Sequence, residues 1–244
     1  MKFKRSLVLA TLCLLMSMPG QSAHAAGSST ETPPEVATTA VGNGHSVDNG
    51  TRDGRLGTRI FDTGDSSIVP DTPNQGWWSA SDDNYPLNAN YIVGQRCGSG
   101  EFRNFFTFDL RTLNQRVVSA SLRINTKDLV GDAYETLRLH DVSTDPQTLN
   151  SRQGRNAAIF ADLGTGKVYG THTLSTEQDD VVVDLQLNRN AIRALNRAQG
   201  GYFSIGGRLT SIESRNPGAD QDQYMFSNSS RQQTVELVTK VRKD

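Results

Sequence analysis

Cysteine and histidine are scarce in this chain of 244 residues, which contains two cysteines and four histidines. The sequence has no Cys-x-x-Cys pair, no His-Glu-x-x-His motif and no Gly-x-Ser-x-Gly motif. These absences argue against a zinc site, a metalloprotease and a hydrolase with a nucleophile elbow. We therefore predict that the protein is not an enzyme and assign no catalytic residue.

Long apolar runs are also missing, except for one near the N-terminus. Three basic residues within the first five positions precede an apolar run over residues 7–18, and the small-residue segment Ala23-His24-Ala25 follows it. This order is typical of a secretory signal peptide, here residues 1–25. The run is too short for a membrane-spanning helix, which needs about 20 residues. We expect a Sec-type secreted or periplasmic protein with no membrane span after processing.

Removal of residues 1–25 changes both the cysteine content and the charge. Cys13 leaves with the signal, so Cys97 would be the one cysteine of the processed chain, either a plain thiol or a site of intermolecular pairing. Of 25 basic residues three are lost, which leaves 22 against 26 acidic ones. A mildly acidic surface of mixed sign argues against nucleic acid as the partner. We expect a polysaccharide or an envelope protein instead.

Large apolar residues are nearly absent from residues 26–58, which are rich in Gly, Ser, Thr, Pro and Asn. Such a segment cannot bury enough surface to offset the entropy lost on ordering. We expect a disordered polar leader there, followed by one folded domain over residues 59–244.

Apolar and polar residues alternate with period two in that domain, as in half-buried strands. Phe106, Phe108 and Leu110 share one face, for example, and Leu122 and Ile124 share another. Further alternating segments occupy residues 59–62, 91–93, 137–140, 159–162, 168–174, 181–187, 202–205, 224–227 and 235–241. Many short strands separated by polar turns predict an all-β antiparallel sandwich, jelly-roll-like in type.

One short helix is expected to interrupt the strands. Asn188 can cap a helix over residues 189–198, with Ile192 and Leu195 spaced to face inward. His140 falls on the strand face opposite its apolar neighbours, so we expect a solvated surface histidine.

Four segments together resemble a known family. Residues 76–79 (GWWS), 90–94 (NYIVG), 103–110 (RNFFTFDL) and 119–124 (SASLRI) are similar to strands of secreted bacterial β-sandwich domains. These domains occur in PEP-CTERM-type envelope proteins and in DNRLRE-type, carbohydrate-binding-module-like jelly rolls. The resemblance implies a sandwich fold and export, while the PEP-CTERM tail itself is lacking here.

An aromatic stretch supplies the candidate binding residues. Trp77 and Trp78 are the two tryptophans, and consecutive residues of a strand point to opposite faces, so one indole would be core and the other exposed. An exposed aromatic ring is a platform for the apolar face of a sugar. We predict a glycan-binding surface made by Trp77 or Trp78 with Tyr85, Asp82 and Asn84. Burial of both tryptophans is the alternative.

Calcium is the candidate cofactor. Asp82 and Asp83 in one segment, and Asp220 and Asp222 in another, place several carboxylate oxygens in loops. Hard cations prefer such oxygen ligands, so a structural calcium ion is expected, with solvated turn acids as the alternative.

Three functions follow from these observations. The first is a noncatalytic secreted module that binds glycan or acts in the envelope or extracellular matrix, which exposed aromatic residues would favour. The second is a structural or protein-interaction domain with no small ligand, which an exposed strand edge would favour. The third is a carbohydrate-active hydrolase, which would need two carboxyl groups about 5–10 Å apart in a cleft.

Overall fold

A computed structural model describes residues 45–47, 56–214 and 222–240 of the chain. The expected signal peptide, most of the polar leader, Asp220 and Val241 lie outside the described residues. Among the described residues, no helix is both long enough and apolar enough to cross a membrane.

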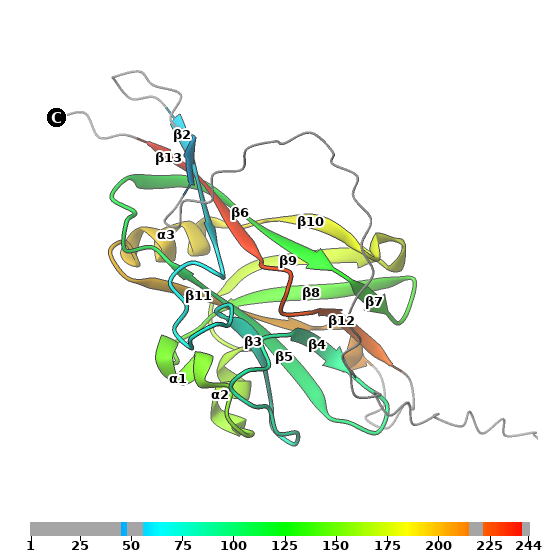
Figure 1. Cartoon of the computed structure of the whole chain (residues 1–244). Coiled ribbons are helices and arrows are strands. Elements are labelled where there is room, and N and C mark those ends of the chain that lie inside the picture. The colour runs from blue at the N-terminus through cyan, green and yellow to red at the C-terminus, as the bar shows by residue number, and fades with distance from the viewer. Residues whose placement is uncertain (1–44, 48–55, 215–221, 241–244) are drawn as a thin grey trace, which may run out of the picture. The chain divides into compact units, whose positions relative to one another are not determined.

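The described strands form two antiparallel sheets (Figure 1). The five-stranded sheet contains, in spatial order, β1 (His45–Val47), β2 (Leu56–Asp62), β13 (Thr234–Lys240), β6 (Arg116–Thr126) and β10 (Val181–Gln186). The eight-stranded sheet contains β7 (Asp128–Val130), β12 (Gln223–Ser227), β4 (Tyr91–Gln95), β5 (Glu101–Asp109), β11 (Tyr202–Leu209), β8 (Tyr134–Asp141) and β9 (Val168–Ser175). Strand β3 (Gln75–Ser79) pairs with β5 outside this order. The fold is therefore the all-β sandwich that the sequence predicts.

The core lies between the two sheets and follows the period-two pattern. Leu122 and Ile124 of β6 and Leu237 of β13 belong to the same buried cluster as Phe106 and Phe108 of β5. The inward rows expected on these strands are confirmed. Val181 was expected to face the core with Val183 and Leu185, but it is exposed, because β10 begins at the open edge of its sheet.

The five-stranded sheet starts earlier than residue 59. Strand β1 and the first residues of β2 fall within residues 26–58, and His45 pairs with Ile60. Backbone hydrogen bonds to a neighbouring strand need no apolar side chains, so a polar strand gives no hydrophobic signal. The prediction of disorder up to residue 58 is therefore wrong for these two segments.

Three α-helices are present among the described residues, where one was expected. The helix α3 (Arg189–Arg197) is confirmed, with Asn188 accepting hydrogen bonds from two of its backbone N–H groups. The segment expected as a strand over residues 159–162 is instead part of helix α2 (Ala157–Asp162), and α1 (Pro146–Ser151) precedes it. Their caps, Asp145 and Asn156, each accept two backbone N–H groups and so favour helix over strand. Two 3₁₀ turns, η1 (Thr176–Gln178) and η2 (Ser211–Ser214), complete the elements.

Helices α1 and α2 lie beside β3 and β5 and cover part of the outer face of the eight-stranded sheet (Figure 1). His140 of β8 is buried, which corrects its assignment to the solvated surface, and its ring lies by the backbone of Thr165 and Gly166. The backbone after α2 also approaches β11 closely, because a Cβ on Gly206 would come within 2.8 Å of Leu163 backbone atoms. Facing away from the core therefore does not mean facing solvent in this sheet.

Candidate functional site

Both tryptophans of β3 are buried, with exposed fractions of 8% for Trp77 and 2% for Trp78. The prediction that one indole would be exposed as a sugar platform is wrong, and the alternative of two buried tryptophans holds. Trp78 packs among Phe105, Leu149 and Ile159, and its Nε1 donates to the Leu149 carbonyl at 3.0 Å. Helices α1 and α2 cover the face of β3 on which Trp78 lies, so this indole is shielded from solvent.

Trp77 belongs to a separate small cluster. It packs with Ile92 and Phe102, and its ring meets that of Phe102 edge-on at a centroid distance of 5.0 Å. Such edge-to-face pairs add about 0.5–1.5 kcal/mol beyond the burial of area. The two indoles therefore stabilise β3 from both sides and leave no ring for a ligand.

Tyr85 is the aromatic residue of the predicted site that reaches solvent. Its side chain is 60% exposed, and that of Leu87 is 68% exposed, on the loop between β3 and β4. Pro86 lies between them and restricts the backbone there. Tyr85, Pro86 and Leu87, which we call the Tyr85 loop, present a small apolar surface beside polar groups.

Asn84 fixes the start of the Tyr85 loop. Its Nδ2 donates to the Trp77 carbonyl at 3.0 Å, and its Oδ1 accepts from Tyr85 N at 2.9 Å and Asn88 Nδ2 at 2.8 Å. Its backbone also exchanges two hydrogen bonds with Gly154. Asn84 is buried, so it orders the loop and is not positioned as a direct ligand contact.

Arg152 supports the same loop from beneath, a role that sequence reasoning missed. Its side chain is fully buried, and Nε and Nη2 donate to the Pro86 carbonyl at 3.0 and 2.6 Å. Nη1 donates to the carbonyls of Pro73 and Gln75, and Nη2 also donates to Thr72 Oγ1. Burial lowers the pKa of Arg152 to about 10, so the guanidinium stays charged at neutral pH.

The expected calcium ligands serve other purposes in the described part of the chain. Asp82 Oδ2 accepts from Gly100 N at 3.4 Å, and Asp222 Oδ1 accepts from Cys97 N at 2.6 Å, so both brace the turn between β4 and β5. Asp83 lies 3.9 Å from Arg155 at the surface. Among the described residues, no three His, Cys, Asp or Glu side chains are grouped to hold a metal ion. Calcium stays a prediction, with Asp220 outside the described residues.

Cys97 lies in the turn that these two aspartates brace. Cys97 is not a free thiol in this structure. The expectation that Cys97 is the one cysteine present concerns the chain after processing, and it stays a prediction.

Two carboxyl groups with raised pKa values hold turns. Burial is the main reason that the pKa of Glu135 is raised, and its oxygens accept from Asp132 N and the Ser211 hydroxyl. Burial also raises the pKa of Asp65, followed by the charge of Asp62, and its Oδ2 accepts from Asp62 N. Both carboxyl groups accept hydrogen bonds from nearby residues of the same chain, as expected of residues with a structural role.

A shallow groove separates β9 from β10, the edge strands of the two sheets. It is lined by Thr171, His172, Thr173, Leu174, Gln178 and residues 181–185. Val181 and Val182 are exposed there, and β10 hydrogen-bonds only to β6 among the described strands. This open strand edge is a second surface on which a partner could bind.

Comparisons with known proteins add little to this geometry. No family model matches the chain, and no curated protein matches its sequence. The fold has a weak match to a solved structure, the C-terminal family 22 carbohydrate-binding module of Clostridium thermocellum Xyn10B. The alignment covers 91% of that module and 74% of this chain, at 8% sequence identity and with a TM-score of 0.23. The sandwich assignment rests on the strand pairing and the shared core, and membership of the DNRLRE-type domains stays a prediction.

Proposed function

We propose that this protein is a noncatalytic, exported module that binds glycan through the Tyr85 loop. The observation that carries the proposal is an exposed tyrosine ring on a loop that Asn84 and Arg152 hold from below. Because the backbone that carries this ring is already ordered, stacking on the apolar face of a sugar requires only the side chain to be ordered.

The polar surroundings suit a sugar as well. Asp83 and Arg155 are exposed near this loop and offer hydrogen-bonding groups to hydroxyls. Arg155 Nη1 donates to the Ser81 carbonyl, which orients the guanidinium along the loop. An apolar ring beside polar side chains is the composition expected of a carbohydrate contact.

Affinity electrophoresis through soluble neutral polysaccharides (β-1,4-glucan, xylan, mannan and dextran) tests this proposal. We expect retardation by at least one polymer, lost in Tyr85→Ala and kept in Tyr134→Ala. Tyr134 is the matched control because it is 65% exposed at the start of β8 and belongs to a different part of the fold. No retardation by any of the polymers, or equal retardation of Tyr85→Ala, would remove the proposal.

An interaction domain is the second candidate, favoured by the edge of β10. Edge strands usually carry charges or prolines that prevent pairing with another chain. The edge strand β10 carries one charged residue, Asp184, but Val181 and Val182 are exposed at its start. Pairing with a second copy would appear in light scattering as a dimer whose fraction rises with concentration. We then expect Val182→Lys to abolish the dimer, and a monomer at all concentrations would exclude self-pairing.

A further inference from the structure

A hollow lined by arginines lies between the start of β6 and the second half of α3. Its lining consists of three arginines and three side-chain amides: Asn114, Arg116, Arg193, Asn196, Arg197 and Gln199. Figure 1 shows α3 beside β6. The whole chain carries one more acidic than basic residue, so this concentration of positive charge is local.

Asn196 holds the hollow in shape. Its Nδ2 donates to the carbonyls of Val117 at 2.9 Å and Ile192 at 2.8 Å, and its Oδ1 accepts from Val117 N at 3.0 Å. Gln199 Nε2 donates to the Gln115 carbonyl at 2.7 Å. These bonds fix α3 against β6, so the backbones that carry Arg193 and Arg197 are held at a set position beside Arg116.

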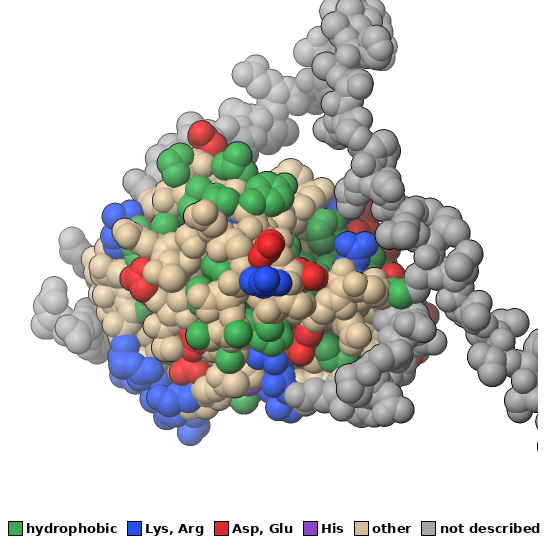
Figure 2. All heavy atoms as spheres, turned by 90° about the horizontal axis from the view of Figure 1, so that it is seen from below, with side chains coloured by type: hydrophobic (Ala, Val, Ile, Leu, Met, Phe, Trp, Pro, Cys, Tyr) green, Lys and Arg blue, Asp and Glu red, His purple; other side chains and the backbone are tan. Residues whose placement is uncertain are grey.

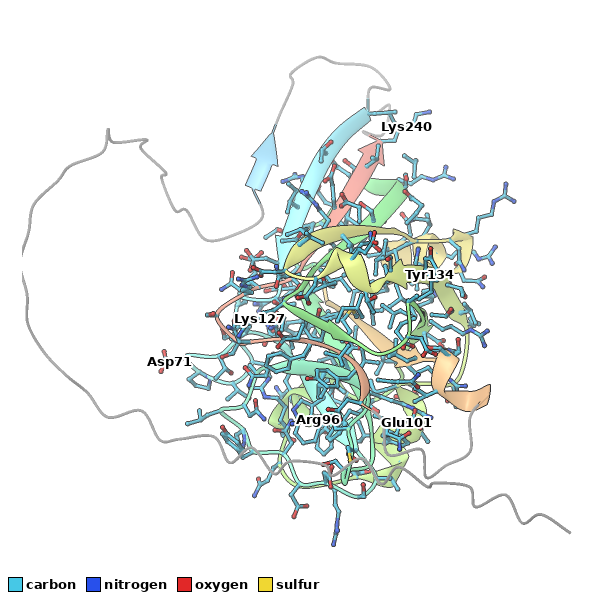
Figure 3. All side chains as sticks on the ribbon, turned by 90° about the vertical axis from the view of Figure 1, so that its right-hand side faces the viewer. Asp71, Arg96, Glu101, Lys127, Tyr134 and Lys240 are labelled. Carbon is cyan, nitrogen blue, oxygen red and sulfur yellow. The ribbon has the colours of Figure 1, made fainter. Side chains whose placement is uncertain are left out.

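The arginines are arranged at an electrostatic cost. Arg193 and Arg197 are four residues apart on α3, where like charges repel. Arg116 pairs directly across the sheet with Lys240, a second unfavourable arrangement (Figure 3 labels Lys240 at the end of β13). An anion bound in the hollow would relieve this repulsion.

Another arginine of β6 shows the opposite arrangement. Arg123 Nε lies 2.8 Å from Asp184 Oδ1, and its Nη1 lies 4.0 Å from Glu236 Oε2. The same strand therefore carries one arginine neutralised by carboxylates and one that faces further cations. All six residues that line the hollow are arginines or amides, so its lining contributes no carboxylate.

We propose that this hollow binds the acidic sugar units of an anionic polysaccharide. Guanidinium groups bind carboxylate or sulfate oxygens through paired, charge-assisted hydrogen bonds. The side-chain amide of Asn114 and the Oε1 of Gln199 suit the hydroxyls that accompany such an anion on a sugar ring. The site goes beyond the proposed function, because it would bind a ligand through the ligand's negative charge and includes no residue of the Tyr85 loop.

Isothermal titration of the purified protein with polygalacturonate, dextran sulfate, neutral dextran and inorganic polyphosphate tests the inference. We expect binding of at least one of the two acidic glycans, weakened about tenfold by Arg193→Gln, as for loss of a charge-assisted hydrogen bond. The loss should be larger in the triple variant with Arg116→Gln and Arg197→Gln, and binding should weaken as salt is added. Arg123→Gln is the matched control and should bind as the unaltered protein does.

Each other outcome overturns the inference. The inference would be wrong if neither acidic glycan bound, or if the triple variant kept its affinity. It would also be wrong if Arg123→Gln lost as much affinity as Arg193→Gln, or if polyphosphate bound as tightly as the glycans. Tyr85→Ala is titrated alongside with the neutral polymers. If the arginine hollow binds no acidic glycan, the result for Tyr85 with neutral polymers is unaffected. If Tyr85→Ala binds neutral polymers unchanged, the result for the acidic glycans is unaffected.

Discussion

At the scale of single residues, the most informative side chain is a buried arginine. The side chain of Arg152 directs its hydrogen bonds to three backbone carbonyls and one hydroxyl, and it joins the end of α1 to residues 72–75 and to Pro86. Its backbone φ of 50° lies in the left-handed region, which is uncommon for a residue other than glycine. The bonds made by the side chain help to hold that conformation.

We predict that Arg152→Ala lowers the free energy of unfolding by more than about 3 kcal/mol, because several buried carbonyls lose their donor. Urea denaturation measures this change. Arg155→Ala is the control and should change stability by less than about 0.5 kcal/mol, since its ion pair is exposed. Equal effects of the two substitutions would show that Arg152 is no support.

The buried His140 leads to a prediction on pH. Burial, followed by the charges of Arg208 and Arg138, lowers the pKa of His140 below its ordinary 6.5. Below pH 6.5 the unfolded chain therefore takes up a proton that the folded chain refuses, so stability falls as pH drops towards the folded pKa. Burial shifts the pKa of His172 in the same direction.

The melting temperature should accordingly fall between pH 7 and pH 5, and His140→Gln with His172→Gln should flatten that fall. Carboxyl groups with ordinary pKa values near 4 contribute mainly at lower pH. Thermal melts of both proteins across this range measure the difference. Parallel curves would contradict a role for the two histidines.

Residue identity alone predicted Tyr85 as a candidate contact but not Arg152. An arginine in a Ser-Arg-Gln-Gly segment has the composition of a solvated turn, and burial of its guanidinium depends on carbonyls from distant loops. Two arginines of the hollow could be related from the sequence, because Arg193 and Arg197 follow Arg189 at intervals of four residues. That spacing marks one face of a helix.

At the scale of elements, the strands could be predicted from the sequence, but the helices that cover the outer face of the eight-stranded sheet could not. Period-two patterns located β5, β6 and β11, because burial on one face leaves alternation in the sequence. The positions of α1 and α2 on the outer face of the eight-stranded sheet depend on tertiary contacts. For that reason His140 and one indole of the Trp77–Trp78 pair were assigned to solvent, yet all three side chains are buried.

Gly206 of β11 tests how closely α2 and the chain after it pack on the sheet. A Cβ at this position would meet the Leu163 carbonyl oxygen at 2.6 Å, and backbone cannot yield as a side chain can. We predict that Gly206→Ala destabilises the fold by about 1–3 kcal/mol or more. Gly201→Ala is the control, because its Cβ would meet no atom closer than 3.6 Å. Comparable urea midpoints for the two variants would contradict the close approach.

At the scale of the whole molecule, two antiparallel sheets share one core, and every candidate surface lies on loops, edges or the end of the sandwich. Figure 2 shows acidic and basic side chains interspersed with small apolar groups on the face seen from below. Neither sign of charge dominates that face, as expected from the near balance of charges in the sequence. The two binding sites that we propose, the Tyr85 loop and the arginine hollow, are accordingly local features of the surface.

The most direct measurement is a map of backbone amide chemical shifts during titration with whichever neutral polysaccharide retards the protein. We predict that the largest changes occur at Tyr85, Leu87 and Asn88 and at Gly154, whose backbone is hydrogen-bonded to Asn84. Changes centred on β10, or no changes at saturating polymer, would contradict glycan binding through the Tyr85 loop.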